Sequence, residues 1–313
     1  GHVVLVFDEC HRSQFGDMHT DITRAFRNYH LFGFTGTPIF AENASSSGKA
    51  NLRTTEQAFG DQLHSYTIVD AIRDKTVLPF RVDYVNTFRV RDGIDNHDVE
   101  GIDTDSAYMN PQRISAVVSY ILEHFNQKTK RHASFQYKER RVNGFNSLFA
   151  TSSIKAARAY YQEFKRQQAA LPEARRLSVG IIYSYAPNAE APGTGLLSEE
   201  SMDPSALSQD DRAFLDEAIA DYNQQFGASF GSDASGFEGY YTSLSTALAE
   251  RRIDLVIVVD MFLTGFDSKS LNTLWVDKNL RAHGLIQAFS RTNRILNSVK
   301  TFGNIVCFRH LEE

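Results

Sequence analysis

The hydrophobic pattern of the chain alternates between short, continuous apolar runs and longer stretches with helical spacing. Apolar runs of this kind are typical of strands that are buried on both faces of a parallel sheet. They occupy residues 3–7, 30–34, 147–150, 177–183, 254–259, 271–276 and 304–309. Because strands alternate with helical segments along the chain, the pattern predicts an α/β fold.

The helical stretches begin and end with recognisable capping residues. Asn110 and Pro111 precede a strongly amphipathic segment whose apolar residues run from Ile114 to Phe125, as expected for a helix with an N-cap and proline at its first position. The turn at 151–153 precedes a predicted helix, and a further helix is expected between Ser208 and Gly227. These signals fix the helices that separate the strands.

Stretches without periodicity divide this pattern into domains. Residues 91–110 are acidic and aperiodic, so we expect a connector there between a first domain at 1–90 and a second at 111–313. Residues 186–207 are rich in Pro, Gly and Ser and predict an acidic insertion in the second domain. The alternating segment 81–90 is assigned to the first domain, as a strand with one solvent-facing side.

Composition narrows the class of protein. Of the 313 residues, 42% are hydrophobic, and no apolar run is long enough to cross a membrane. The two cysteines form no CxxC pair, and no signal peptide is visible, so we expect a cytoplasmic location. The net charge of −5 argues against a wholly basic nucleic-acid coat protein but does not exclude a nucleic-acid enzyme with contacts confined to one groove.

Two acidic residues, Asp8 and Glu9, directly follow the first apolar run. Ligands of parallel sheets bind outside the carboxyl ends of the strands. Adjacent carboxylates at such a place repel each other unless a cation lies beside them. A magnesium ion that carries a nucleotide phosphate fits, with one acid holding the metal and the other activating water. The alternative is that both acids only cap the next helix.

The second apolar run ends in Thr35, Gly36 and Thr37, a turn where a phosphate-facing loop is expected. The same residues also make a good generic turn. No G-x-x-x-x-G-K-[ST] loop occurs in the chain. The first domain therefore matches only the second half of a mononucleotide-binding lobe.

In the second domain, the strand at 254–259 runs into a loop that contains Gly265 and Asp267. Further on, Gln287, Arg291 and Arg294 lie on or beside a predicted helix, where residues three apart share a face. Two guanidiniums on one face repel each other unless an anion binds both of them, and a triphosphate is such an anion. The alternative is a surface ion-pair cluster.

A basic stretch at 128–141, with Phe135 and Tyr137 interleaved, also has two interpretations. It is either a patch that tracks a phosphate backbone or, as we favour, a solvated loop.

In this order, the motifs resemble the superfamily-two helicase and translocase motors from their second to their sixth motif. The residues of these motifs are most similar to those of the motor (R) subunit of type I restriction endonucleases. The resemblance covers nearly the whole chain and implies two RecA-like parallel-sheet lobes, the first one incomplete. It is carried by residues 8–14 (DECHRSQ), 33–38 (GFTGTP), 261–267 (MFLTGFD) and 287–294 (QAFSRTNR).

The resemblance implies roles for the residues of the first lobe. Asp8 holds Mg²⁺ through water, and Glu9 activates the hydrolytic water. His11 links the nucleotide to the second lobe through Gln287. Thr35, Gly36 and Thr37 couple hydrolysis to DNA movement.

For the second lobe, the resemblance implies that Gly265 and Asp267 line the nucleotide site and that Arg291 and Arg294 reach the γ-phosphate as arginine fingers. Such fingers contribute about three to five orders of magnitude in rate in other phosphoryl-transfer systems.

The implied function is ATP-dependent translocation of duplex DNA before cleavage by a separate nuclease domain. The implied partners are the specificity and methyltransferase subunits of a type I complex, with no membrane involved. The phosphate-binding loop and the nuclease domain are missing from this sequence, so we expect no ATP hydrolysis or cleavage by this segment alone. The alternatives are another superfamily-two DNA or RNA helicase and a catalytically inactive nucleic-acid-binding fragment.

Overall fold

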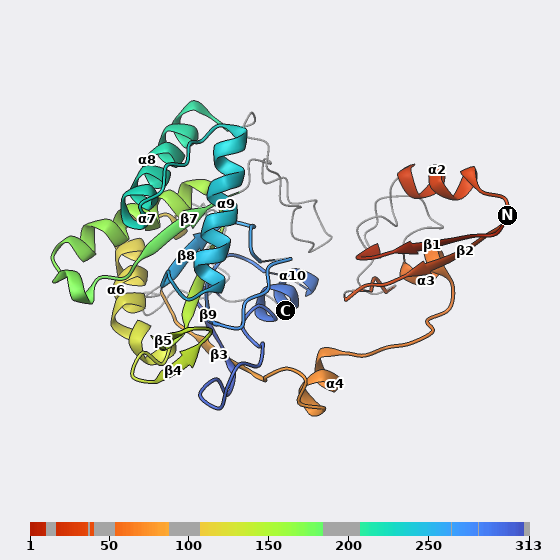
Figure 1. Cartoon of the computed structure of the whole chain (residues 1–313), viewed down its shortest axis with the longest axis horizontal. Helices are drawn as coiled ribbons and strands as arrows, with labels where there is room; N and C mark the ends of the chain where they lie inside the picture. Colours follow the sequence, from red (N-terminus) through yellow and green to blue (C-terminus); the bar gives the residue numbers. More distant parts are fainter. Residues whose placement is uncertain are drawn as a thin grey trace, which may run out of the picture. The chain divides into compact units, whose positions relative to one another are not determined.

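The chain forms two compact units that divide between Thr76 and Val77 (Figure 1). They are called the first and second unit below, and each is described by itself. The computed structural model describes residues 1–10, 17–36, 38–40, 54–87, 107–183, 207–263, 265–280 and 282–309.

The described part of the first unit contains a two-stranded parallel sheet. β1 (Val3–Phe7) pairs with β2 (Tyr29–Gly33), with Val3 opposite Tyr29 and Phe7 opposite Gly33. The helices are α2 (Asp17–Ala25), α3 (Thr55–Phe59) and α4 (Ile68–Arg73). α3 and α4 each begin with a capping box, in which a threonine and the residue three positions later bind each other's backbone amides.

The prediction that the strands at 3–7 and 30–34 are buried on both faces is wrong. In β2 only Leu31 is partly buried. Val4 and Val6 are 59% and 61% exposed, whereas Phe7 packs against the rings of Phe59 and His19 at 5.8 Å and 5.6 Å between centroids. The apolar run is typical of a strand with residues packed against both faces. The described residues of the first unit pack only against the face that carries Phe7.

The second unit is built on a six-stranded sheet with the order β3-β10-β9-β6-β8-β7. Every neighbouring pair is parallel, so each connection must cross over the sheet. The strands are β3 (Phe80–Tyr84), β6 (Asn146–Thr151), β7 (Val179–Ile182), β8 (Leu255–Val258), β9 (Leu271–Asp277) and β10 (Gly303–Cys307).

β3 corrects the sequence-based assignment of its segment to the first domain. It pairs with β10, with Phe80 opposite Gly303 and Tyr84 opposite Cys307, and so forms the edge of the second sheet. The physical reason is a long-range backbone pairing that a local alternation of polar and apolar residues does not encode. Residues 88–106 and 184–206, which include most of the predicted connector and insertion, lie outside the described part of the chain.

The helices of the second unit are α6 (Pro111–Lys128), α7 (Ile154–Ala169), α8 (Gln209–Phe226), α9 (Ala234–Ala249) and α10 (Ala282–Phe289), with a short 3₁₀ helix η2 (Glu173–Arg175). Three of them, α6, α7 and α8, begin where the capping signals predict. Asn110 Oδ1 accepts a hydrogen bond from the Gln112 amide at 2.9 Å, and the side chains of Ser153 and Ser208 cap α7 and α8. None of the described helices combines the length and apolarity that a membrane crossing requires.

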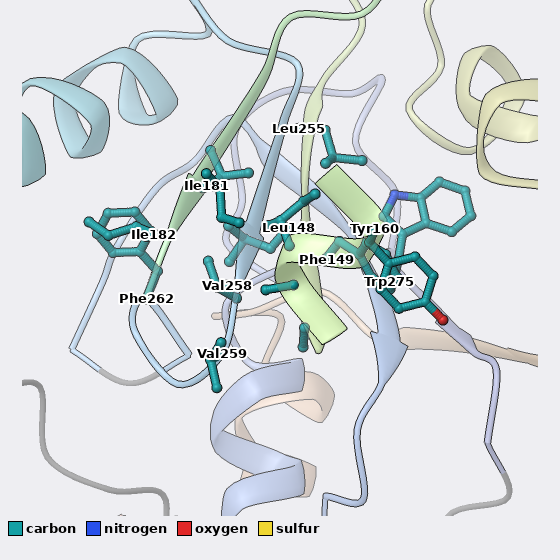
Figure 2. Close-up of a cluster of buried hydrophobic side chains, with 14 of the residues drawn as sticks. Leu148, Phe149, Tyr160, Ile181, Ile182, Leu255, Val258, Val259, Phe262 and Trp275 are labelled. Atoms are coloured by element: carbon teal, nitrogen blue, oxygen red, sulfur yellow. The ribbon is translucent and has the colours of Figure 1, made fainter. Parts of the chain in front are cut away.

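The core of the second unit is formed by strands that are covered on both sides. Every residue of β6, β8, β9 and β10 is buried. Figure 2 shows labelled core side chains from several of these strands, together with Tyr160 of α7 and Phe262 after β8. Phe149 packs against the rings of Tyr160 and Phe164 at 4.7 Å and 6.5 Å between centroids. This covered parallel sheet confirms the predicted α/β class.

The basic stretch at 128–141 is not the solvated loop that we favoured. It contains an antiparallel hairpin of β4 (Ser134–Tyr137) and β5 (Arg140–Asn143). The Tyr137 hydroxyl donates to the Ala249 carbonyl at 2.8 Å, and Arg140 Nη2 donates to the Glu250 carbonyl at 2.6 Å. The hairpin thus supplies donors and positive charge to the C-terminal end of α9, where a helix favours both.

Candidate functional site

The two predicted metal-binding acids lie in a tight turn at the carboxyl end of β1. Asp8 and Glu9 are both exposed. Asp8 Oδ1 accepts a hydrogen bond from the Glu9 amide at 2.9 Å. Glu9 has a φ of +46°, in the left-handed region that non-glycine residues rarely adopt. The turn therefore presents two neighbouring carboxylates to solvent.

The turn after β2 lies beside these acids. The Cys10 amide donates to the Phe34 carbonyl at 3.0 Å, and the Phe34 amide donates to the Phe7 carbonyl at 2.8 Å. Parallel strands end at the same edge, so Thr35 and Gly36 follow β2 next to the acids. The structure thus brings together the two predicted motifs of the first unit.

Gly33 makes this close approach possible. A Cβ at position 33 would lie 2.8 Å from Cys10 Sγ and 2.8 Å from the Phe59 ring. Cys10 is fully buried, and burial raises the pKa of its thiol to about 11, with further contributions from Glu9 and Asp8. Cys10 is therefore a packing residue behind the acids rather than a thiolate nucleophile.

Two further residues of the predicted site, His11 and Thr37, lie outside the described residues. Their roles stay predictions.

In the second unit, the predicted loop follows β8 and is anchored by a buried ion pair and by two packed phenylalanine rings. Lys278 Nζ binds Asp260 Oδ1 at 2.7 Å, and both residues are buried. Phe262 is fully buried and packs against the ring of Phe266 at 4.8 Å between centroids. Gly265 has a φ of +68°, which favours glycine at this position. Gly265 and Asp267 are exposed on this loop, whereas Phe262 and Phe266 are buried and anchor it to the core.

Both predicted arginines bind this loop. Arg291 Nη1 donates to the Phe266 carbonyl at 2.6 Å, and its Nε donates to the Gln287 carbonyl at 3.1 Å. Arg294 Nε binds Asp267 Oδ1 at 2.9 Å. The five predicted residues of the second unit are therefore brought together by the structure.

The reason for this convergence differs from the predicted one. α10 ends at Phe289, so Arg291 and Arg294 lie after the helix and share no helix face. The loop after β8 reaches both of them instead. The backbone between the two arginines is held by the segment before β3, because the Leu78 amide donates to the Asn293 carbonyl at 2.8 Å.

The ion pair between Arg294 and Asp267 is exposed to solvent. The two side chains are 43% and 62% exposed. Pairs of this kind contribute only about 0–1 kcal/mol to stability. Arg294 can therefore exchange Asp267 for another anion at little cost.

A buried lysine behind this ion pair was missed by sequence reasoning. Lys300 is 1% exposed. Its Nζ donates to the carbonyls of Lys269 and Leu271 at 2.9 Å and 2.6 Å. Burial lowers the pKa of Lys300 to about 7, with Asp267 acting to raise it and Arg294 to lower it. No local pattern distinguishes this lysine from a surface lysine.

A second buried charged cluster lies at the carboxyl end of β9. Asp277 binds Arg113 at 2.6 Å and Arg309 at 3.0 Å, and it accepts a hydrogen bond from the Tyr160 hydroxyl at 2.6 Å. Burial acts to raise the pKa of Asp277, but Arg113 and Arg309 outweigh it and hold the pKa below its usual value. The cluster joins α6, α7, β9 and the residues after β10, and we assign it to stability.

The acids at the end of β1 fit a magnesium ion that is bound together with a nucleotide. Within the described residues, no group of three or more His, Cys, Asp or Glu is arranged to hold a metal. Mg²⁺ does not need one, because it usually keeps several waters and takes one or two carboxylates plus substrate phosphates. Asp8 and Glu9 are two carboxylates of the kind that such a set takes.

Two family models match the chain. One, described as SWI2/SNF2 ATPase, matches residues 1–112. The other, described as type I restriction enzyme subunit R domain 3, matches residues 143–310.

Curated relatives agree with these matches. Type I restriction enzyme endonuclease subunits of Staphylococcus aureus and Staphylococcus saprophyticus are each 41% identical over 315 residues, covering 99% of this chain and 31% of the relative. The chain thus spans about a third of the length of these relatives. Among solved structures, a fragment described as an HsdR subunit of a type I restriction enzyme from Vibrio vulnificus matches with a TM-score of 0.56 and 13% identity, over 97% of this chain and 43% of that one. At that identity the match shows the fold alone.

Proposed function

Because this chain belongs to the type I restriction enzyme subunit R family, we propose that it carries residues of both halves of an ATP-driven motor that moves duplex DNA. The motor works in the complete subunit, of which this chain corresponds to about a third. Cleavage of the DNA belongs to a nuclease domain elsewhere in that subunit.

The observation that carries the proposal is the convergence of two arginines on one loop. Arg291 and Arg294 bind Phe266 and Asp267, so guanidiniums gather where the motor motifs require a phosphate-binding surface. In the first unit, the matching observation is the pair of acids beside Thr35 and Gly36.

In the first unit, Asp8 would hold Mg²⁺ through water, and Glu9 would take a proton from the attacking water. The ion held there would supply positive charge for phosphoryl transfer. Thr35, Gly36 and Thr37 would transmit the nucleotide state to the DNA.

In the second unit, Gly265 and Asp267 would line the nucleotide site. Arg291 and Arg294 would stabilise the negative charge on the γ-phosphate in the transition state. Gln287 would take part with His11 in sensing the nucleotide. Since Arg291 is tied to the loop backbone and Arg294 only to an exposed carboxylate, Arg294 is the more easily redirected of the two.

The partners that we propose are duplex DNA and the specificity and methyltransferase subunits of a type I complex. The complex would act on DNA in the cytoplasm.

The proposal is tested by measuring ATP hydrolysis by the complete subunit, assembled with its partner subunits, on duplex DNA and on duplex RNA of equal length. We expect stimulation by duplex DNA without strand separation. Stimulation by RNA, or strand separation as the main activity, would favour another superfamily-two helicase. No nucleotide binding at all would favour an inactive module.

A further inference from the structure

Lys300 binds, from the buried side, the end of the loop that follows β8 in the second unit. Its side chain is buried, and its Nζ bridges the carbonyls of Lys269 and Leu271, which follow Asp267 in the chain. A lysine is almost never fully buried without a partner, because its charge is costly to remove from water. The partners of Lys300 are two backbone carbonyls. Among the described residues, no carboxylate forms an ion pair with its amine.

The charged groups around Lys300 oppose one another. Asp267 favours the protonated form of its amine, and Arg294 disfavours it. These two side chains are bound to each other at 2.9 Å, so they act on Lys300 with opposite sign as a pair. Lys130, which follows α6, donates to the Val299 carbonyl next to Lys300, and the side chain of Lys269 is exposed.

Resting on the proposed function, in which Arg294 reaches the γ-phosphate, we propose that Lys300 is a positioning residue that takes over from Arg294 as the counter-charge of Asp267. When Arg294 leaves Asp267 for the phosphate, the Lys300 amine accepts one proton from solvent. The resulting ammonium keeps its bonds to the two carbonyls and balances the charge of Asp267, whose partner Arg294 has left. The loop therefore stays in place although its ion pair to Arg294 is lost.

The direction of the proton transfer follows from the charges. Removing Arg294 ends its repulsion of the Lys300 ammonium, and it also leaves the negative charge of Asp267 uncompensated. Both changes raise the pKa of Lys300 from its resting value of about 7. Below that pH the amine is protonated with or without nucleotide. Above it, binding takes up a proton, so nucleotide affinity falls as pH rises, by up to about tenfold per pH unit.

The experiment is calorimetric titration of the complete subunit with the non-hydrolysable analogue AMP-PNP and Mg²⁺ at pH 8. Buffers of different ionisation enthalpy give the number of protons taken up. We expect Lys300→Met to take up fewer protons than the parent, by up to one, and to lose the corresponding part of the pH dependence of affinity. Lys300→Arg, which stays charged, should restore affinity without restoring proton uptake.

Two further variants keep the test decisive. Asp267→Asn should reduce the extra proton uptake, because it removes the negative charge that stabilises the Lys300 ammonium, and it leaves the buried lysine in place. Lys269→Met, which removes a positive charge from the same loop but keeps its carbonyl, should retain the proton uptake of the parent.

The outcomes separate this inference from the proposed function. Equal proton uptake by the parent, Lys300→Met and Asp267→Asn would overturn the role of Lys300, even if binding depends on Arg294. If Arg294→Ala binds the analogue as tightly as the parent, Arg294 does not reach the phosphate, and the proposed role of that residue falls together with the inference.

Discussion

The carbonyl of Phe266 accepts a hydrogen bond from Nη1 of Arg291 at 2.6 Å. A residue that follows α10 is thereby tied to the loop that follows β8. Because Phe266 is itself buried against Phe262, the arginine is held by the core of the second unit and not only by surface contacts. This is the preorganisation that a transition-state contact requires.

Replacing Arg291 by alanine should lower DNA-stimulated ATP turnover of the complete subunit by about three orders of magnitude or more, as the loss of an arginine finger does elsewhere. Steady-state hydrolysis at saturating DNA measures the effect. Arg175→Ala, at an exposed position after α7, should leave turnover unchanged. A loss of less than tenfold would remove Arg291 from the list of groups that touch the phosphate.

The exposed ion pair predicts a different behaviour for Asp267. Asp267→Asn should change the free energy of unfolding of this chain by less than about 1 kcal/mol, because both partners are solvated. The fluorescence of Trp275, which is the only tryptophan and is fully buried in β9, follows unfolding of the second unit in denaturant. A larger loss of stability would mean that the pair has a structural role.

The buried cluster around Asp277 predicts a large and pH-dependent effect. Asp277→Asn leaves two buried guanidiniums without their carboxylate, which should cost about 3–5 kcal/mol at neutral pH. Since the folded-state pKa of Asp277 is lowered from 3.8, its contribution is present above that pH and is lost as pH falls through the lowered value. The stability difference between the parent and the variant should therefore shrink in acid, again followed by Trp275. A difference that is constant with pH would contradict this assignment.

Gly33 predicts how tightly the two motifs of the first unit are packed. Gly33→Ala should destabilise the first unit by about 1–3 kcal/mol, because the added methyl meets Cys10 and Phe59. Gly36→Ala has open space around its Cβ and should cost little. Hydrogen exchange of peptides from β1 and β2 compares the two variants. Equal exchange would show that the strands can separate to accept the methyl.

The helices of the second unit could be predicted from sequence because their signals are local. Asn110 and Pro111 start α6, and Ser208 and Gly227 bound α8, as the capping pattern indicates. The apolar runs likewise identified the core strands of the sheet.

The features that sequence could not predict depend on contacts between distant residues. β3 has a periodicity that suits either sheet, and only its pairing with β10 decides between them. The sequence suggests that Arg291 and Arg294 share a helix face, whereas in the structure both bind a loop some 25 residues earlier. The burial of Lys300 could not be predicted from the local sequence, because it depends on the loop that packs over this lysine.

The central claim is that the acids after β1 carry the chemistry of an ATP-driven motor. It is tested most directly by DNA-stimulated ATP turnover of the complete subunit with Glu9→Gln, which keeps the size of the side chain but removes its basic oxygen. Glu56→Gln, an exposed glutamate on α3, is the matched control. The account predicts a loss of about 100-fold or more for Glu9→Gln, with nucleotide binding retained, and none for Glu56→Gln. Turnover of Glu9→Gln close to that of the parent would contradict it.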